Sequence, residues 1–594
     1  MSTSARSRDL EAAPAQKADQ PRRAQESTTG RTMGSMSIVT QVDLSQAQHG
    51  INAIGHGDFQ KFILCFTITA HMALLCHSNA LALITDPVDH WCRPPPEFAE
   101  MAAAQWKNVG IPVDASGGYS QCLAYAHNGS GLNDSETTPC NEWDYDEEAA
   151  SRSARSHWDL VCHRAWLLSL GKGVFMSGTL LVTPAMGYLA DTKGRQPVIV
   201  GASYVLVLCT LASCFAEVYP IYVALTFVNS ACASTIHIVT VILLFEVAPP
   251  EYRTFYSGLG SSVGVLLAEL FLTLVSTTRT SWQVRQLIVV SPTILLLSVT
   301  FIVYESPLWL LTMYKLKEAE EIMNMAATMN RTPRIRTQRA VHRIKHAMRK
   351  VSIPYLAASP AALMLHGTLR LRAAGIFATT YAIMLAYYSL VWSDRLSGGR
   401  NLLLRIASAL LLGPAYLFMY VALSRMGRLQ FMLVLFALVG GATGLYAVAI
   451  YAQPQEVAYA LFVVAKCLTS AMIPPNYLYM AELFPTSMRS AVMCTAYTFG
   501  HVGAVFASSL SLLQSAGRED LEFAVVSAQV FLCMTVLLAM PETGFATVTT
   551  AAPRAERGGA VPNILREPPG PNNETNTLMG DEPKELAHSQ RNVK

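Results

Sequence analysis

Long apolar runs recur along this chain of 594 residues, and they limit its possible folds more than any other feature. A helix that crosses the hydrocarbon core of a bilayer needs roughly 20 mainly apolar residues. Strands of a membrane barrel are only about ten residues long and alternate in polarity, unlike these runs. We therefore expect an all-α membrane protein. The twelve predicted spans, six in each half, are residues 61–82, 166–186, 198–216, 221–245, 254–275, 287–304, 373–392, 402–421, 430–450, 457–477, 490–513 and 521–540.

The scarcity of charge excludes other classes of protein. Asp, Glu, Lys and Arg make up 14% of the chain, whereas soluble proteins average about 25%. A soluble multidomain enzyme of this length would need more charge to cover its surfaces. The net charge of +3 is too small to indicate a nucleic-acid partner. The lipid bilayer is the expected partner.

The predicted spans divide the chain into parts. The expected parts are a disordered tail at 1–58, a six-helix half at 59–311 that includes a large loop at 86–164, a polar loop at 312–371, a second half at 372–541, and a disordered tail at 542–594. Lys and Arg gather in the 312–371 loop and in the short connections, as in cytoplasmic loops. With an even number of helices, both termini share that side. We expect a multi-pass protein of the plasma membrane with cytoplasmic termini and an extracellular, acidic 86–164 loop.

The large loop carries two further signs of an extracellular position. Four cysteines there suggest two disulfides, for which three pairings are possible. These cysteines are Cys92, Cys122, Cys140 and Cys162. Asn128 and Asn133 begin glycosylation sequons in the same loop. The sequons at Asn330 and Asn573 fall on the cytoplasmic side and are expected to stay unmodified.

Two related motifs follow the second predicted helix of each half. The first, GYLADTKGR at 187–195, resembles the signature of the major facilitator superfamily. The second, ALSRMGR at 422–428, is a degenerate copy with Ser424 at the acidic position. Such copies are typical of parallel repeats, although an ordinary tight turn could resemble either one alone. Asp191 can face a helix N-terminus across the interface between the halves. Candidate gating residues in the first copy are Gly187, Asp191, Gly194 and Arg195.

Other segments resemble the organic cation, anion and zwitterion transporters, and they occur in that family's order. They are DHWCRPPP at 89–96, PCNEWDYD at 139–146, SHWDLVC at 156–162, YESPLWLL at 304–311, YYSL at 387–390, AELFPTSMRS at 481–490 and MPET at 540–543. The resemblance implies a twelve-helix facilitator that moves organic ions through a central cavity. The chain is a divergent member, because TFVNS at 226–230 replaces the family's R-F-L-x-G and Leu308 replaces an arginine.

Ionisable residues inside the spans are costly in hydrocarbon and normally face a cavity or a partner. By resemblance, His501 occupies the family's charge-selecting position, although a histidine bonded to a neighbouring helix is the alternative. Glu269 is expected to face the cavity, and the alternatives are that it is protonated or that it pairs with Lys466 or His501. His71, Tyr387 and Tyr388 are further cavity candidates, for which packing is the alternative. The spacing of His71 and His77 places them on different helix faces, which disfavours a metal site. His237 also lies inside a span.

Two carboxylates near the ends of predicted helices are candidates for a cytoplasmic gate. Glu246 and Glu482 shortly precede Arg253 and Arg489. We expect these residues to form ion pairs that break as the halves move. Separate surface charges at the helix ends are the alternative.

The chain lacks the signs of an enzyme. The phosphate-binding pattern G-x-x-x-x-G-K-[S/T] does not occur, and no catalytic or metal-spaced constellation stands out. We expect a carrier of small organic ions that works by alternating access, without cofactor or metal. Glu269 and the acidic loop favour cations. The alternatives are an anion or zwitterion carrier that uses Lys466 and protonated His501, and a non-transporting receptor or scaffold. The oligomeric state stays open.

Overall fold

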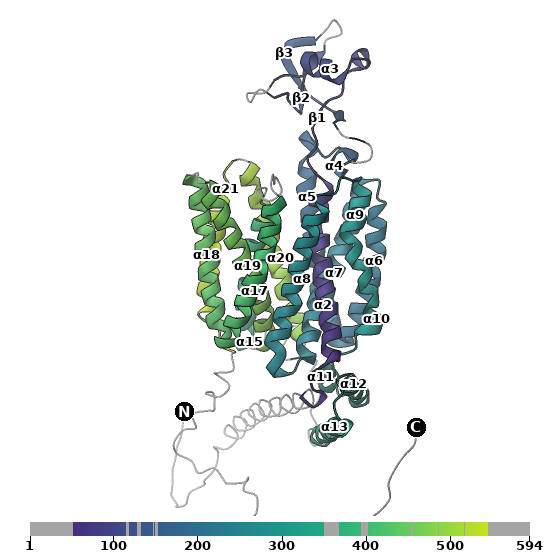
Figure 1. Ribbon diagram of the computed structural model, residues 1–594, viewed down its shortest axis with the longest axis vertical. Coiled ribbons are helices and arrows are strands. Elements are labelled where there is room, and N and C mark those ends of the chain that lie inside the picture. Colours follow the sequence, from purple (N-terminus) through teal and green to yellow (C-terminus); the bar gives the residue numbers. More distant parts are fainter. Residues whose placement is uncertain are drawn as a thin grey trace, which may run out of the picture. The chain divides into compact units, whose positions relative to one another are not determined.

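The computed structural model describes most of the chain between Asn52 and Thr543 (Figure 1). The described residues are 52–113, 118–127, 132–146, 148, 152–349, 367–393, 402–452, 455–484, 486–515 and 517–543. Nearly all of both tails predicted to be disordered, and the glycosylation candidate Asn128, lie outside these residues.

Five long helices and one interrupted helix form the first half. The long helices are α2 (Asp58–Ile84), α5 (Trp166–Lys193), α6 (Arg195–Cys214), α7 (Tyr219–Val247) and α8 (Arg253–Val275). The sixth span, predicted as one helix over 287–304, consists of α9 (Trp282–Val290), the 3-10 helix η5 (Ser291–Ser298) and α10 (Val299–Ile302). Pro292 has no N–H to continue the α-helical bonds of α9, which accounts for the change at η5.

Six long helices form the second half. They are α15 (Gly367–Val391), α17 (Leu402–Arg425), α18 (Arg428–Ala452), α19 (Gln455–Leu483), α20 (Arg489–Ser515) and α21 (Glu519–Leu537). Among the described residues, eleven helices are long and apolar enough to cross a membrane. The interrupted sixth span completes a layout of twelve.

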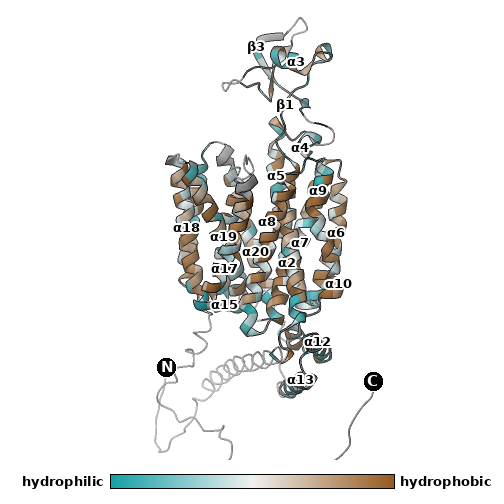
Figure 2. Ribbon diagram, viewed as in Figure 1, coloured by the Kyte–Doolittle hydropathy of each residue, from teal (hydrophilic) through white to brown (hydrophobic). Residues whose placement is uncertain are grey.

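The two halves meet along a few helices. In Figure 1 the purple-to-teal helices of the first half lie beside the green-to-yellow helices of the second. Helix α5 packs against α20, and α8 packs against α17 and α19. Figure 2 shows long helices that are mostly brown, with teal concentrated near their ends and in the segments beyond them. Charged side chains are scarce in the chain, and those at the contact between the halves are the first candidates for function.

The loop at 86–164 contains short strands that the sequence analysis did not predict. Strand β1 (His90–Cys92) pairs antiparallel with β4 (Trp143–Tyr145), and β2 (Leu123–His127) pairs antiparallel with β3 (Leu132–Pro139). The loop also contains the short helices α3 (Ala103–Gly110) and α4 (Ala154–His157) and the 3-10 helices η1 (Pro96–Phe98) and η3 (Cys162–Arg164). The glycosylation candidate Asn133 lies on β3.

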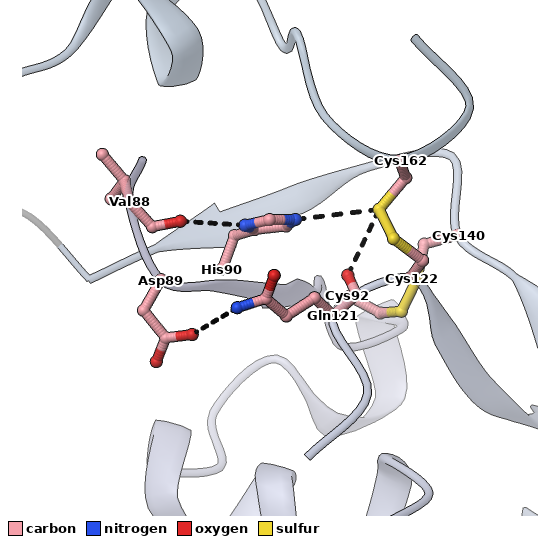
Figure 3. Close-up of a disulfide and its surroundings, with 8 residues drawn as sticks. All are labelled: Val88, Asp89, His90, Cys92, Gln121, Cys122, Cys140 and Cys162. Carbon is pink, nitrogen blue, oxygen red and sulfur yellow. Dashed lines mark hydrogen bonds between the residues drawn. A yellow bond between two sulfur atoms is a disulfide. The ribbon is translucent and has the colours of Figure 1, made fainter. Parts of the chain in front are cut away.

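The structure selects one of the three possible disulfide pairings. Cys92 is bonded to Cys140, and Cys122 is bonded to Cys162 (Figure 3). The ring of His90 lies beside the second disulfide, with Nε2 3.7 Å from Sγ of Cys162. The ring of His90 and the sulfurs of Cys122 and Cys162 are close enough together for a metal ion. However, two cysteines joined in a disulfide do not offer thiolate ligands.

We call the end of the helical bundle where α2 begins and α21 ends the terminal face, and the opposite end the loop face. Three helices beyond the bundle belong to the terminal face: α11 (Pro307–Thr312), α12 (Leu316–Met329) and α13 (Arg334–Arg349). Asn330, which begins one of the sequons, binds the start of α2. Its side-chain oxygen accepts a hydrogen bond from the Phe59 N–H, and its amide donates to the carbonyls of Ile54 and Gly55. The Asn330 side chain therefore connects the residue that follows α12 to the start of α2.

Candidate functional site

The first contact between the halves at the terminal face is made by Asp191, near the C-terminal end of α5. Its carboxylate accepts hydrogen bonds from the backbone N–H groups of Ser490 and Ala491, at 3.2 and 2.7 Å. These N–H groups belong to the first turn of α20, where they have no partner within the helix. Gly187 allows the approach, because a Cβ there would lie 2.6 Å from the Ser490 carbonyl oxygen. The structure thus places Asp191 at a helix N-terminus of the other half, as its motif predicts.

A network of buried charges lies beside this contact. Arg195 pairs with Asp191 at 3.0 Å and with Glu246 at 3.1 Å. Glu246 also pairs with Arg489 of the second half, at 2.9 Å. Arg195 reaches the second half as well, by donating to the Thr486 carbonyl. We call Asp191, Arg195, Glu246 and Arg489 the terminal-face network. All four side chains are buried, so separation of the halves here would leave charges without partners unless water enters.

Glu305 supports this network from the PES motif. Its carboxylate accepts hydrogen bonds from the N–H groups of Arg195 and Gln196, at 3.0 and 3.1 Å, and so caps the start of α6. Burial raises the pKa of the Glu305 carboxyl. Gly194 has a φ of 116°, which favours glycine, and a Cβ there would lie 2.3 Å from the Glu305 carboxylate. The motif is recognisable in the sequence, but this capping role of Glu305 was not predicted from it.

The second half repeats this arrangement in a weaker form. Glu542 of the MPET motif caps α18, accepting from the N–H groups of Leu429 and Gln430 at 3.0 and 3.3 Å. Arg428 pairs with Glu482 at 3.6 Å and donates to the hydroxyl of Thr254 in α8 at 2.9 Å.

At the position that corresponds to Asp191, the Ser424 hydroxyl donates to the Tyr420 carbonyl of its own helix. The side chain at 424 therefore makes no cross-half bond comparable with that of Asp191 among the described residues.

The gate candidate Arg253 lies over the ring of Phe245, with its guanidinium group 4.6 Å from the ring centroid.

A second ion pair joins the halves farther from the terminal face. Glu269 of α8 accepts a hydrogen bond from Lys466 of α19 at 3.0 Å. The Lys466 side chain is 7% exposed and that of Glu269 is 19% exposed. Of the two partners considered for Glu269, the structure brings Lys466 to it.

The remaining cavity candidates form a row of rings. His501 is buried, its Nδ1 lies 3.0 Å from the Tyr497 carbonyl, and its ring contacts those of Tyr497 and Tyr388. Tyr387 and Tyr388 are buried and pack edge to face. His71 stacks on His237. His501 is therefore held within its own helix and by aromatic neighbours, and its charge-selecting role stays a prediction.

A pocket near the loop face takes its lining from both halves. It contains His77, Lys172, Tyr222 and Thr226 of the first half and Trp392 of the second. The Lys172 ammonium lies 5.7 Å from the centroid of the Trp392 ring. The halves are thus tied together by ion pairs at the terminal face, while they border a pocket on the other side.

Comparison with known proteins identifies the family. A family model described as Sugar (and other) transporter matches residues 122–552. The chain belongs to this family. Its similar relatives include the "Beta-alanine transporter" of Drosophila melanogaster, which is 26% identical with 82% of this chain and 85% of the relative covered. The "Organic cation transporter protein" of the same fly is 26% identical, with 82% and 90% covered. "Organic anion transporter 3" of Rattus norvegicus is 27% identical, with 73% and 80% covered.

A solved structure supports the fold. The proton:xylose symporter XylE bound to 6-bromo-6-deoxy-D-glucose superposes with a TM-score of 0.55 at 15% identity, covering 82% of this chain and 97% of that one. The predicted twelve-helix major facilitator fold is confirmed. So are the predictions of a divergent relative of organic ion transporters and of a transporter rather than an enzyme. The relatives include both cation and anion carriers and do not resolve which charge this transporter prefers.

Proposed function

We propose that this transporter carries small zwitterionic organic ions by alternating access and that the substrate binds between Glu269 and Lys466. The observation that carries the proposal is their ion pair, which joins the two halves at 3.0 Å. Two charges separated from each other in a low-dielectric interior need new partners. A substrate that has both an ammonium and a carboxylate supplies one for each. The named substrate of the fly "Beta-alanine transporter" has this chemistry.

Organic cations are the second candidate. The sequence favoured them because of Glu269 and the acidic 86–164 loop. The pairing of Glu269 with Lys466 removes the first of these reasons, since the carboxylate is already neutralised. The acidic loop remains, because negative charge near an entrance raises the local concentration of cations.

The terminal-face network supports a gating role for the candidate residues. Its ion pairs hold the halves together at one face, while the pocket beside Lys172 lies toward the other. Alternating access requires that such contacts break and form as one half moves against the other. We infer that the terminal face is cytoplasmic, because its loops and helices carry most of the Lys and Arg, and that the protein resides in the plasma membrane.

Uptake of labelled compounds by proteoliposomes tests the proposal. The panel contains β-alanine, carnitine, tetraethylammonium and para-aminohippurate. We expect uptake of β-alanine or carnitine, and at least a roughly tenfold loss in both E269Q and K466Q, because each leaves one charge unpaired. The double variant E269K/K466E keeps the pair with its direction reversed and should recover part of the uptake. K61Q, which removes an exposed ion pair with Asp58, is the matched control.

The other outcomes separate the alternatives. Uptake of tetraethylammonium alone, unchanged by K466Q, would assign the protein to the cation carriers and overturn the zwitterion proposal. No uptake of any compound by correctly inserted protein would favour the non-transporting receptor or scaffold.

A further inference from the structure

Two histidines that the Glu269–Lys466 proposal does not use lie stacked inside the bundle. The rings of His71 in α2 and His237 in α7 have centroids 4.1 Å apart and planes inclined by 27°. Nδ1 of His71 lies 3.0 Å from the Ser261 carbonyl of α8, so this nitrogen carries a hydrogen. His237 is fully buried, and neither of its ring nitrogens has a hydrogen-bond partner among the described residues.

An arrangement of this kind calls for an explanation. Nearly all buried polar groups in proteins have hydrogen-bond partners, and each one left unpaired costs about 1–3 kcal/mol. The other intramembrane histidines differ in this respect. His77 has Nε2 3.0 Å from the hydroxyl of Thr293, and His501 has Nδ1 3.0 Å from the Tyr497 carbonyl. The two free nitrogens of His237 therefore indicate a group that acquires its partner in another conformation.

His237 lies where the halves meet. Its ring meets that of Tyr477 of α19 edge-on, with centroids 5.7 Å apart, and that of Tyr497 of α20, with centroids 6.2 Å apart. Both tyrosines belong to the second half. Nine residues separate His237 from Glu246 of the terminal-face network, which is about 13 Å along α7. Opening of that network would therefore bring solvent toward the two histidines, whereas both side chains are buried in the closed arrangement.

The charged groups on the neighbouring helices have other partners. Lys172 of α5 lies over the Trp392 ring, Arg253 of α8 lies over the Phe245 ring, and Glu482 of α19 pairs with Arg428. On α5, α6 and α20, Asp191, Arg195 and Arg489 belong to the terminal-face network with Glu246 of α7 itself. On α8 and α19, Glu269 pairs with Lys466. On α2, Asp58 and Lys61 pair at its exposed start, and His77 binds Thr293. The titratable rings that contact His237 are those of His71, Tyr477 and Tyr497, with His501 behind Tyr497.

We propose that His71 and His237 form a site for one proton, which is empty while the terminal face is closed and filled when that face opens. An imidazolium without partner or water is strongly disfavoured in a dry interior. In water an imidazole takes up a proton near pH 6.5. Two stacked imidazolium ions would repel each other, so the pair holds a single proton. Because the proton binds the open state, acid shifts the population toward opening.

This inference goes beyond the proposed function, since opening can be measured without a substrate. Cys494 of α20 is buried where Gly187 of α5 packs against it, and opening of the terminal face would expose its thiol. The test is maleimide labelling of Cys494 in the purified full chain, read by peptide mass spectrometry at pH 6.0 and 7.5. The ratio of wild type to the double variant H71Q/H237Q cancels the ionisation of the thiol itself.

We expect that ratio to rise about fourfold between pH 7.5 and 6.0, because proton binding at a pKa near 6.5 favours the open state by a factor of about 1.1 at pH 7.5 and about 4.2 at pH 6.0. Each single variant, H71Q or H237Q, keeps one imidazole that can take up the proton in water, so each should retain most of the rise, and H71N/H237N is a second double variant if H71Q/H237Q fails to fold. H77Q should behave like wild type, because His77 lies outside the pair. A ratio of wild type to the double variant that stays the same at pH 7.5 and 6.0 would overturn the proton site. That result would leave the transport proposal intact, and failure of uptake with a normal labelling shift would do the reverse.

Discussion

At the scale of single residues, one carboxylate oxygen connects the two halves. Oε1 of Glu246 accepts from Arg195 at 3.1 Å and from Arg489 at 2.9 Å, and these arginines come from different halves. Both guanidinium groups are buried. Removal of one partner from a buried ion pair typically costs about 3–5 kcal/mol, because the remaining charge stays desolvated. Glu246 is therefore the residue whose neutralisation should loosen the terminal face most.

We expect E246Q to lower the melting temperature of the purified protein by several degrees and to speed the labelling of Cys494. Glutamine keeps the size of the side chain but loses the charge that balances two arginines. E251Q is the matched control, since Glu251 lies in the connection directly after α7 and is exposed. Equal melting temperatures for the two variants would show that the ion pairs add nothing to the closed state.

At the scale of helices and strands, the sequence predicts positions better than interruptions. The twelve spans follow from apolar runs because the thickness of the bilayer fixes how long each must be. The 3-10 segment at Pro292 was not predicted, because prolines such as Pro414 of α17 lie inside continuous helices. The strands of the 86–164 loop also escaped prediction, since they are short and disulfides connect the segments around them.

The contact between α5 and α20 gives a prediction at this scale. G187A places a Cβ 2.6 Å from the Ser490 carbonyl and 2.5 Å from Cβ of Cys494. Overpacking of this kind costs about 1–3 kcal/mol, so we expect uptake to fall roughly tenfold. G173A is the matched control, because that glycine lies in the same helix and has nothing within 4 Å of its added Cβ. Both variants gain the same helix propensity from alanine. Equal uptake by the two would contradict a tight α5–α20 contact as part of the transport cycle.

At the scale of the whole molecule, pairings between the halves were the hardest feature to predict. The sequence named Glu269, Lys466 and His501 as intramembrane candidates, but could not decide between two partners for Glu269. That choice depends on how α8 and α19, 197 residues apart at this pair, are rotated toward each other. The repeat itself was recognised from two motifs. The matching caps, Glu305 on α6 and Glu542 on α18, could not be predicted, because each joins two segments that are far apart in the sequence.

The repeat also predicts how its weaker copy can be strengthened. Ser424 precedes Arg428 by four residues, as Asp191 precedes Arg195, and Arg428 already binds Thr254 in the first turn of α8. The carboxylate introduced by S424D should therefore face the N-terminus of α8. Such an interaction contributes about 1 kcal/mol, which is roughly a fivefold shift toward the closed state. We expect a higher melting temperature and slower labelling of Cys494. S424A should match wild type, since the Ser424 hydroxyl binds only its own helix. If S424D behaved like S424A, a carboxylate in the second motif would not hold the terminal face closed as Asp191 does in the first.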